Sequence, residues 1–445
     1  MSTLMIAKRR RRARGFTLVE LMVSLIAGLF VALAVVGLST QATATFHEEA
    51  RTANSEMSLR TAVERLRADL QRAGYMSSGN FQRDPMIAMA PGATKPIAGT
   101  YNSLYKLAGI HLLSEGSLAL TPLSGNNGFK PDMIDLSGNF TTTDDYVVRF
   151  TAPGGSCGGT RLTLSADSPA MWRMLAQSNP DASLEAAFQP VSGSQFLARV
   201  TDDTGHFQYL PTCAGKAAGV TGSGITATAF VDLDTSTLPL LTAQDTGTNG
   251  GVTGLGVGRL RVNPVQTIRW QVRPLNSANS GDGPYMALST SSGGDAGTTD
   301  KYELFRTFVD ATGTVTQQPE LVAEYAVDLK FGFGADTGLA GAANRPLTVY
   351  ALSADTQNQA LADDVVTNAV TAPQRIRSVH FRLSTRSAVA DRAEPYSMPI
   401  PNAKEVAYPT RYCVLQTCTP GQTGWARIRS ITSEVSTPNL AKYFY

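Results

Sequence analysis

Histidine and cysteine are scarce in this chain of 445 residues, which has four of each. No histidine lies close in the sequence to a pair of cysteines, so the spacing that a zinc site requires is missing. An H-E-x-x-H motif, a phosphate-binding P-loop and paired catalytic carboxylates are also missing. These absences favour a protein that is not an enzyme and that carries no cofactor. The histidines, expected to be ordinary surface or core residues, are His47, His111, His206 and His380.

Acidic residues are missing from residues 1–15, where six Lys and Arg residues occur. The whole chain has 38 Lys and Arg residues against 36 Asp and Glu residues, so its net charge of +2 comes from this leader, and the remainder has a formal charge of −4. A negative remainder argues against nucleic acid as a partner, because phosphate binding needs a basic patch. Cations ahead of an apolar segment keep the N-terminus in the cytoplasm and send the following chain outward. The six are Lys8, Arg9, Arg10, Arg11, Arg12 and Arg14.

Charge is absent from residues 21–38, and no proline occurs before Pro85. An apolar run of this kind predicts a transmembrane helix over residues 16–38. Glu20 stands at the start of the run, although an acidic side chain at the centre of a membrane helix costs about 2.5–3.5 kcal/mol. Such a carboxylate needs either a partner or a position at the membrane interface.

Three interpretations of the N-terminus are open. A cleaved secretory signal would use Ala42-Thr43-Ala44 as its cleavage site, but the apolar run is too long for one. A simple membrane anchor explains everything except Gly15 and Glu20. The third interpretation uses both residues. The hexapeptide Gly15-Phe16-Thr17-Leu18-Val19-Glu20, behind a basic leader and ahead of an apolar run, resembles the type III signal of type IV pilins and pseudopilins.

This resemblance implies processing of the leader and a role for Glu20. A prepilin peptidase, which is a membrane aspartyl peptidase, would remove residues 1–15 by cutting after Gly15 and would methylate the new N-terminal residue, Phe16. In a filament, Glu20 would neutralise the amine of Phe16 on a neighbouring subunit, because opposite charges attract strongly in a low dielectric. The alternative is a carboxylate that reaches the membrane interface without a partner.

The helical pattern continues beyond the apolar run and predicts one helix over residues 16–74. No glycine or proline occurs between Leu38 and Gly74, and Gly74 is a suitable stop. Apolar residues recur at steps of three and four, which predicts a single apolar face that packs on a globular head. The members of this face are Phe46, Ala50, Ala53, Met57, Leu59, Val63, Leu66, Leu70 and Ala73.

Residues 75–445 change character, because segments rich in β-branched and aromatic residues alternate with Gly, Ser, Thr and Asn. The expected fold class is α+β, with a long N-terminal amphipathic and transmembrane helix packed on a large antiparallel β-rich head. An inserted subdomain is expected at about residues 100–310, and short helices at residues 170–177 and 319–325. The predicted strands are residues 146–150, 161–165, 196–201, 225–233, 267–272, 302–309, 326–333, 376–384 and 426–433.

Several motifs of this region resemble the PilW family of minor pilins. Residues 70–75 are similar to the end of that family's long helix, residues 320–334 to its short helix and following strand, and residues 375–387 to its next strand. Residues 427–440 are similar to its end. The resemblance implies a pilin-like fold and a single-pass protein of the inner membrane with its head in the periplasm. It also implies later incorporation in a type IV pilus, or fimbrium, at the tip.

The same resemblance implies a set of partners. These are other minor pilins, the major pilin, prepilin peptidase and the inner-membrane assembly platform, in a complex that primes pilus assembly and so serves twitching motility and cell adhesion. A type II secretion pseudopilin is the alternative, because it has the same N-terminal signal. An adhesin or a DNA-uptake module built on a pilin stem is an alternative of a different class.

The four cysteines all follow the apolar segment and so are expected outside the cytoplasm, where disulfides form. Four cysteines allow three connectivities. The favoured pairs are Cys157 with Cys213 and Cys413 with Cys418.

Two short motifs raise the question of chemistry. Residues 154–158 (GGSCG) match the G-x-S-x-G of hydrolases literally, but a strand-like segment follows them where the nucleophile elbow needs a helix. Residues 245–249 (DTGTN) resemble the start of a calcium loop but lack a glutamate twelve residues on. A serine hydrolase is therefore disfavoured, and calcium in a loop stays an open alternative.

Overall fold

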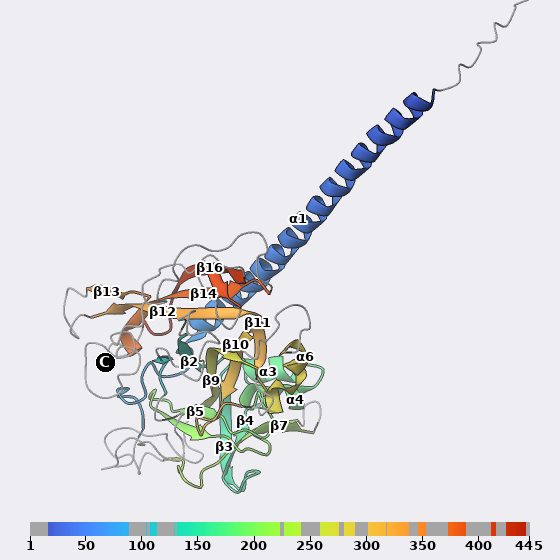
Figure 1. Ribbon diagram of the computed structural model, residues 1–445. Coiled ribbons are helices and arrows are strands. Elements are labelled where there is room, and N and C mark those ends of the chain that lie inside the picture. Colours follow the sequence, from blue (N-terminus) through green and yellow to red (C-terminus); the bar gives the residue numbers. More distant parts are fainter. Residues whose placement is uncertain are drawn as a thin grey trace, which may run out of the picture. The chain divides into compact units, whose positions relative to one another are not determined.

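The computed structural model describes residues 17–88, 104, 107–113, 129, 131–222, 227–241, 259–275, 280–289, 301–316, 318–337, 346–352, 373–388, 411–414 and 424–441. The chain divides into two compact units, Met1–Asn54 and Ser55–Tyr445. The first contains an apolar helical segment, and the second contains two antiparallel sheets (Figure 1). This confirms the predicted α+β fold, in which an N-terminal apolar helix is followed by a large antiparallel β-rich region.

Helix α1 (Leu18–Arg72) is a single helix of 55 residues. Its first part, Leu18–Thr43, is long and apolar enough to cross a membrane, and none of it is buried inside the chain. The helix ends just before Gly74, whose φ of 74° is a left-handed conformation that suits glycine. The Gly74 N–H donates to the Ser137 carbonyl at 2.8 Å, so the chain passes directly from the helix onto a strand of the head.

The prediction of one continuous apolar face on this helix is wrong. Leu59, Leu66 and Leu70 are buried in the head, whereas Phe46 and Met57 are 67% and 72% exposed. Met57 and Leu59 are two residues apart, which is about 200° around an α-helix, so they point to nearly opposite sides. Met57 therefore lies on a different side of the helix from Leu59, and its side chain is exposed.

The strands of the described residues form an 11-stranded and a five-stranded sheet. The first consists of β1 (Ile110–Leu113), β2 (Met133–Gly138), β3 (Tyr146–Pro153), β4 (Thr160–Leu164), β5 (Leu197–Thr201), β6 (Phe207–Pro211), β7 (Ala218–Thr221), β8 (Thr228–Leu233), β9 (Arg261–Pro274), β10 (Tyr302–Val309) and β11 (Glu320–Ala323). The second consists of β12 (Ala326–Asp336), β13 (Leu347–Tyr350), β14 (Ile376–Arg386), β15 (Arg411–Cys413) and β16 (Trp425–Ser436), in the order β13-β12-β14-β16-β15.

Strand β9 joins the two halves of the 11-stranded sheet. Its first residues, through Val265, pair with β3 and β5, and its remaining residues pair with β2 and β10. The C-terminal turns of α1 share one apolar core with both sheets; this core includes Leu66, Trp270 and Phe381. A second core lies under β3, β4 and β8 and includes Met171 and Phe188 from two short helices.

The short helices begin as their sequences dictate. Helix α3 (Pro169–Leu175) and helix α4 (Pro180–Phe188) each start with a proline. Each is preceded by an N-cap residue, Ser168 or Asn179, whose side chain accepts a hydrogen bond from a backbone N–H of the first turn. The other helical segments among the described residues are η3 (Ser280–Tyr285), α6 (Met286–Ser289) and η4 (Pro373–Arg375).

The predicted helix at residues 319–325 is also wrong, because this segment contains strand β11. The strand pairs with β10, placing Leu321 opposite Phe305 and Glu320 opposite Arg306. Backbone pairing with a neighbouring strand overrides the weak helix preference of the sequence. Immediately after β11, Tyr325 has a φ of 56°, and the chain turns there into β12 of the other sheet.

Candidate processing and assembly site

Thr17 and Glu20 form a reciprocal hydrogen-bonded cap at the start of α1. The Thr17 N–H and the Thr17 hydroxyl both donate to Glu20 Oε2 at 3.0 Å, and the Glu20 N–H donates to Thr17 Oγ1 at 3.3 Å. This arrangement is a capping box, which satisfies N–H groups that the start of a helix leaves unpaired. Glu20 therefore has a partner inside its own chain before any other subunit is present.

Sequence reasoning missed this cap, although Thr-x-x-Glu ahead of an apolar run is its signature. It gave Glu20 either a partner on another chain or, as the alternative, a position at the membrane interface without a partner. The two roles are compatible, because both bonds from Thr17 end on Oε2 and a carboxylate has a second oxygen. Gly15 and Phe16, the residues of the predicted cleavage site, lie outside the described residues.

Hydroxyl groups in the apolar segment bond to its own backbone. Ser24 Oγ donates to the Leu21 carbonyl at 2.9 Å, and Thr40 Oγ1 donates to the Gly37 carbonyl at 2.9 Å. A hydroxyl without a hydrogen bond is costly in hydrocarbon, so these bonds suit a helix that lies in lipid. Within Leu18–Thr43, Glu20 is thus the group whose charge sets it apart from an ordinary membrane span.

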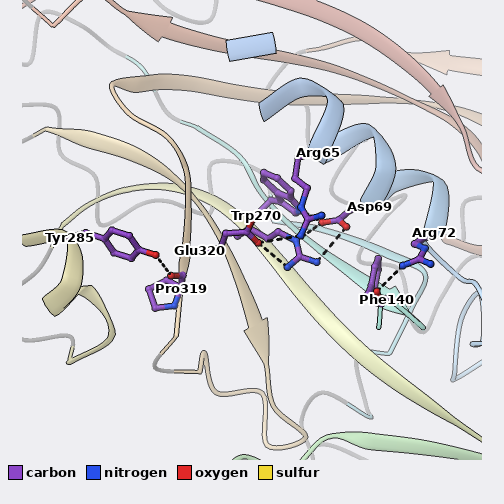
Figure 2. Close-up of polar contacts among 9 residues, drawn as sticks. Arg65, Asp69, Arg72, Phe140, Trp270, Tyr285, Pro319 and Glu320 are labelled. Atoms are coloured by element: carbon purple, nitrogen blue, oxygen red, sulfur yellow. Dashed lines mark hydrogen bonds and ion pairs between the residues drawn. The ribbon is translucent and has the colours of Figure 1, made fainter. Parts of the chain in front are cut away.

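The last turns of α1 are fixed to the head by a charge network (Figure 2), in which Asp69 and Arg306 are buried and Arg65 and Glu320 are about half exposed. Asp69 Oδ2 accepts hydrogen bonds from Arg306 Nε at 2.7 Å and from Trp270 Nε1 at 3.0 Å. Arg306 also contacts Glu320 at 3.2 Å, and Glu320 contacts Arg65 at 3.4 Å. Through Trp270, Arg306 and Glu320, this network joins the helix to β9, β10 and β11.

Two further contacts hold the end of the helix. Arg72 Nη1 donates to the Phe140 carbonyl at 2.7 Å (Figure 2), and Asn439 Nδ2 donates to the Gln71 carbonyl at 2.8 Å. The first comes from the loop after β2, and the second comes from the segment after β16. Both sheets therefore bond to the same helical turn.

The G-x-S-x-G match is the connection of a β-hairpin. Residues 154–158 lie in the short connection 154–159 between β3 and β4, and Gly154 has a φ of 97°. The Ser156 N–H donates to Asp232 Oδ2 at 2.8 Å, and its hydroxyl donates to the Lys216 carbonyl at 2.8 Å. A nucleophile elbow needs a helix after the serine, and a strand follows here. The motif therefore has a structural explanation.

The same loop carries a disulfide. Cys157 is bonded to Cys213, and the Cα atoms are 5.6 Å apart, which is the pairing that the sequence favours. Cys413 is also disulfide-bonded. Cys418 lies outside the described residues, so its pairing with Cys413 stays a prediction.

Among the residues that the structure describes, no group of three or more His, Cys, Asp or Glu side chains is placed to hold a metal ion. The calcium-like residues 245–249 lie outside that part of the chain. The calcium alternative therefore stays untested.

Comparison with known proteins bears on the N-terminus. Residues 10–36 match the prokaryotic N-terminal methylation motif. The matched segment contains Gly15, Phe16 and the capping pair Thr17 and Glu20. It supports a type IV pilin-like protein that is processed by prepilin peptidase and anchored in the membrane by its apolar helix. No curated protein and no solved structure matches the chain.

Proposed function

We propose that this chain is a PilW-like minor pilin of a type IV pilus system. The observation that carries the proposal is the combination at the N-terminus. A methylation motif covers residues 10–36, and Glu20 opens an apolar helix whose large side chains from Leu18 to Leu38 are each more than half exposed. The protein waits in the inner membrane with its head in the periplasm. Its work is assembly and display, not catalysis.

The exposed apolar helix suits two successive environments. In the membrane, lipid covers the side chains of Leu18–Thr43. In a filament, the helices of neighbouring subunits cover them instead. Nothing in the span changes between the two states except the surroundings, so the transfer requires that the single charge at Glu20 be satisfied in both.

In the membrane, the first of these two environments, the capping box satisfies the Glu20 carboxylate. Before assembly, the Thr17 N–H and hydroxyl bond to the Glu20 carboxylate. In the filament, the amine of Phe16 on a neighbouring subunit meets that carboxylate as an ion pair. An ion pair in low dielectric is stable only when its geometry is good, and a charge without its partner is strongly penalised. A subunit therefore seats only where its carboxylate meets an amine.

The head supports a place in a priming complex at the pilus tip. It contains an 11-stranded and a five-stranded sheet, and it shares one core with the last turns of α1. A large head clashes with close helical stacking along a fibre, whereas a terminal position leaves it free. The partners are other minor pilins, the major pilin and the inner-membrane assembly platform.

The proposal is tested by separating charge from hydrogen bonding at position 20. In a strain of the source bacterium that lacks the gene, Glu20→Gln keeps an amide oxygen that can accept the Thr17 bonds but removes the charge. We expect membrane insertion and leader cleavage to persist and incorporation into sheared pili to fall at least tenfold. The measurements are the N-terminal mass of the membrane form and immunoblots of the pilus fraction.

Thr17→Ala is the matched control, because it removes the cap hydroxyl and leaves the charge. We expect it to assemble better than Glu20→Gln. Normal incorporation of Glu20→Gln into pili would contradict the proposed pairing. A membrane form that keeps the arginine-rich leader would contradict the pilin assignment itself.

The alternative that shares the matched motif is a type II secretion pseudopilin. The deletion strain separates the two. Loss of pili and of twitching with normal protein secretion supports the minor pilin, and the reverse supports the pseudopilin. Immunogold labelling of the head at pilus ends supports the tip position, whereas labelling along the whole fibre contradicts it.

A further inference from the structure

The chain passes from one sheet to the other at Glu324 and Tyr325. Strand β11, just before them, pairs with β10, and β12, just after them, pairs with β13 and β14. Tyr325 has a φ of 56°. This left-handed conformation is unfavourable for a residue with a side chain, so it persists only where the surroundings hold it.

Three residues hold Tyr325 in place. Its N–H donates to Glu303 Oε2 at 3.0 Å, and its carbonyl accepts a hydrogen bond from the Arg386 N–H at 2.9 Å. Lys301 Nζ lies 4.3 Å from the centre of its ring, and the Arg386 guanidinium lies 4.9 Å from it. Glu303 belongs to β10 and Arg386 to β14, so the crossover is fixed from both sheets.

Glu303 is the central charge of this crossover, and its side chain is fully buried. Its Oε1 is 3.0 Å from Lys301 Nζ, which is also 2.6 Å from Glu324 Oε2. On the adjacent strand β9, Arg273 lies opposite Glu303 in the ladder and forms an ion pair with Asp282 at 2.6 Å. Burial raises the pKa of Glu303 to about 7, although the nearby Lys301 charge lowers it.

We propose that Glu303 makes the crossover a pH-responsive joint between the two sheets. When ionised, its carboxylate binds both the Lys301 ammonium and the Tyr325 N–H. When it takes up a proton from solvent, it no longer forms an ion pair, and Lys301 keeps Glu324 as its carboxylate partner together with its hydrogen bond to the Leu288 carbonyl. A neutral carboxyl is also a weaker acceptor for the Tyr325 N–H. This joint depends on the contacts of the head alone and not on the proposed function.

Protonation has opposite effects on the whole fold and on the joint. The pKa of Glu303 in the folded chain, about 7, lies above its ordinary value of 4.5. A raised pKa means that the neutral form stabilises the fold at low pH and that this stability is lost as the pH rises through 7. Acidification therefore makes the fold more resistant to denaturant while it weakens the hydrogen bond at Tyr325.

The first test is the pH dependence of unfolding of the full chain in detergent. Urea unfolding at pH 5.5 and pH 8 is followed by the fluorescence of the buried Trp270 and Trp425. The ratio of the wild-type unfolding equilibrium constant to that of Glu303→Gln should rise on the order of thirtyfold from pH 5.5 to pH 8. The control Glu320→Gln removes another acid of the same segment, one that contacts Arg65 and Arg306, and should follow the wild type.

The second test needs no variant. Amide hydrogen exchange of peptides that cover residues 320–330 is measured in the wild type at both pH values and corrected for the intrinsic pH dependence. We expect weaker protection at pH 5.5. An equal pH dependence of unfolding in the wild type and Glu303→Gln overturns the proposal. Protection at residues 320–330 that does not change with pH also overturns the proposal. If the Gln variant does not fold, this exchange measurement on the wild type is the deciding test.

Discussion

Asp69 and Arg306 neutralise each other at the junction of α1 and the sheet, where they are 4% and 7% exposed. Their burial follows from their neighbours, since Leu66 and Leu70 on the same helix pack into the shared core. Removing one member of a buried ion pair leaves a charge without compensation, which is far more harmful than removing an exposed pair.

We expect Asp69→Ala to lower the free energy of unfolding by about 3 kcal/mol, because it leaves the buried Arg306 with only the half-exposed Glu320 as its partner and removes the acceptor of Trp270 Nε1. Urea unfolding of the full chain measures this loss. The matched control is Glu56→Ala on the same helix, which breaks an exposed pair with Arg60 and should cost no more than about 0.5 kcal/mol. Equal losses in the two variants would contradict the assigned role of Asp69.

Asp135 is expected to make stability fall at very low pH. Burial raises the pKa of this carboxyl, but hydrogen bonds and charges from Arg269 and His111 outweigh it and lower the pKa to about 2. A lowered pKa contributes stability above the ordinary value of 3.8, and that stability is lost as the pH falls toward 2. The contribution is about 2 kcal/mol at neutral pH.

Acid unfolding of the wild type and of Asp135→Asn checks this prediction. The variant should be less stable at pH 6, and the two proteins should converge near pH 2. A constant difference across this range would mean that the ionisation of Asp135 is not responsible.

At the scale of elements, the disulfide joins the β3–β4 hairpin to the end of β6. The two cysteines are separated by 56 residues in the sequence. Closing a loop of this length in the unfolded chain stabilises the fold by about 4 kcal/mol in the chain-entropy model. The bond thus links the connection between β3 and β4 to the segment just after β6.

We expect the double substitution Cys157→Ala with Cys213→Ala to lose a large part of this stability. Urea unfolding in the presence and absence of a reductant makes the comparison. The reductant should destabilise the wild type more than the double variant, because in the double variant it can act on the bond of Cys413 but not on the β3–β4 hairpin. If the double variant matched the oxidised wild type, the disulfide would not contribute to stability.

At the scale of the whole molecule, one of the two units has apolar cores, whereas the described span Leu18–Thr43 of the other unit has no buried side chain. The unit Ser55–Tyr445 includes both sheets and the helical turns that pack on them, whereas Leu18–Thr43 buries nothing inside the chain. An unburied apolar helix needs lipid or other helices around it.

We expect a chain that begins at Ser55 to be soluble without detergent and to keep the Cys157–Cys213 bond. A chain that begins at Ser77 should aggregate, because it lacks Leu59, Leu66 and Leu70 and exposes the core that they cover. Size-exclusion chromatography and circular dichroism distinguish the two. Aggregation of both chains would mean that the apolar span takes part in the folding of the head.

Local patterns predicted part of the head well. The predicted strand at residues 302–309 coincides with β10, and the predicted helix at residues 170–177 overlaps α3. The local sequence of residues 319–325 favours a helix. Seven residues carry no information about their strand partner, β10, because that pairing depends on tertiary packing. Strand β9 is longer than predicted, because Pro264 suggests a break and the strand continues through it.

The amino-acid sequence alone indicated the N-terminal signal, since its parts lie within one short segment: the basic leader, Gly15 and Phe16, Glu20 and the apolar run. The hydrogen bonds between Thr17 and Glu20 were found only in the structure. Hydropathy and helical periodicity are local, so no fold is needed to evaluate them. Only the tertiary structure decided which charges are buried. Asp69, Arg306 and Glu303 come from distant segments, and their pairing depends on how two sheets and one helix pack together.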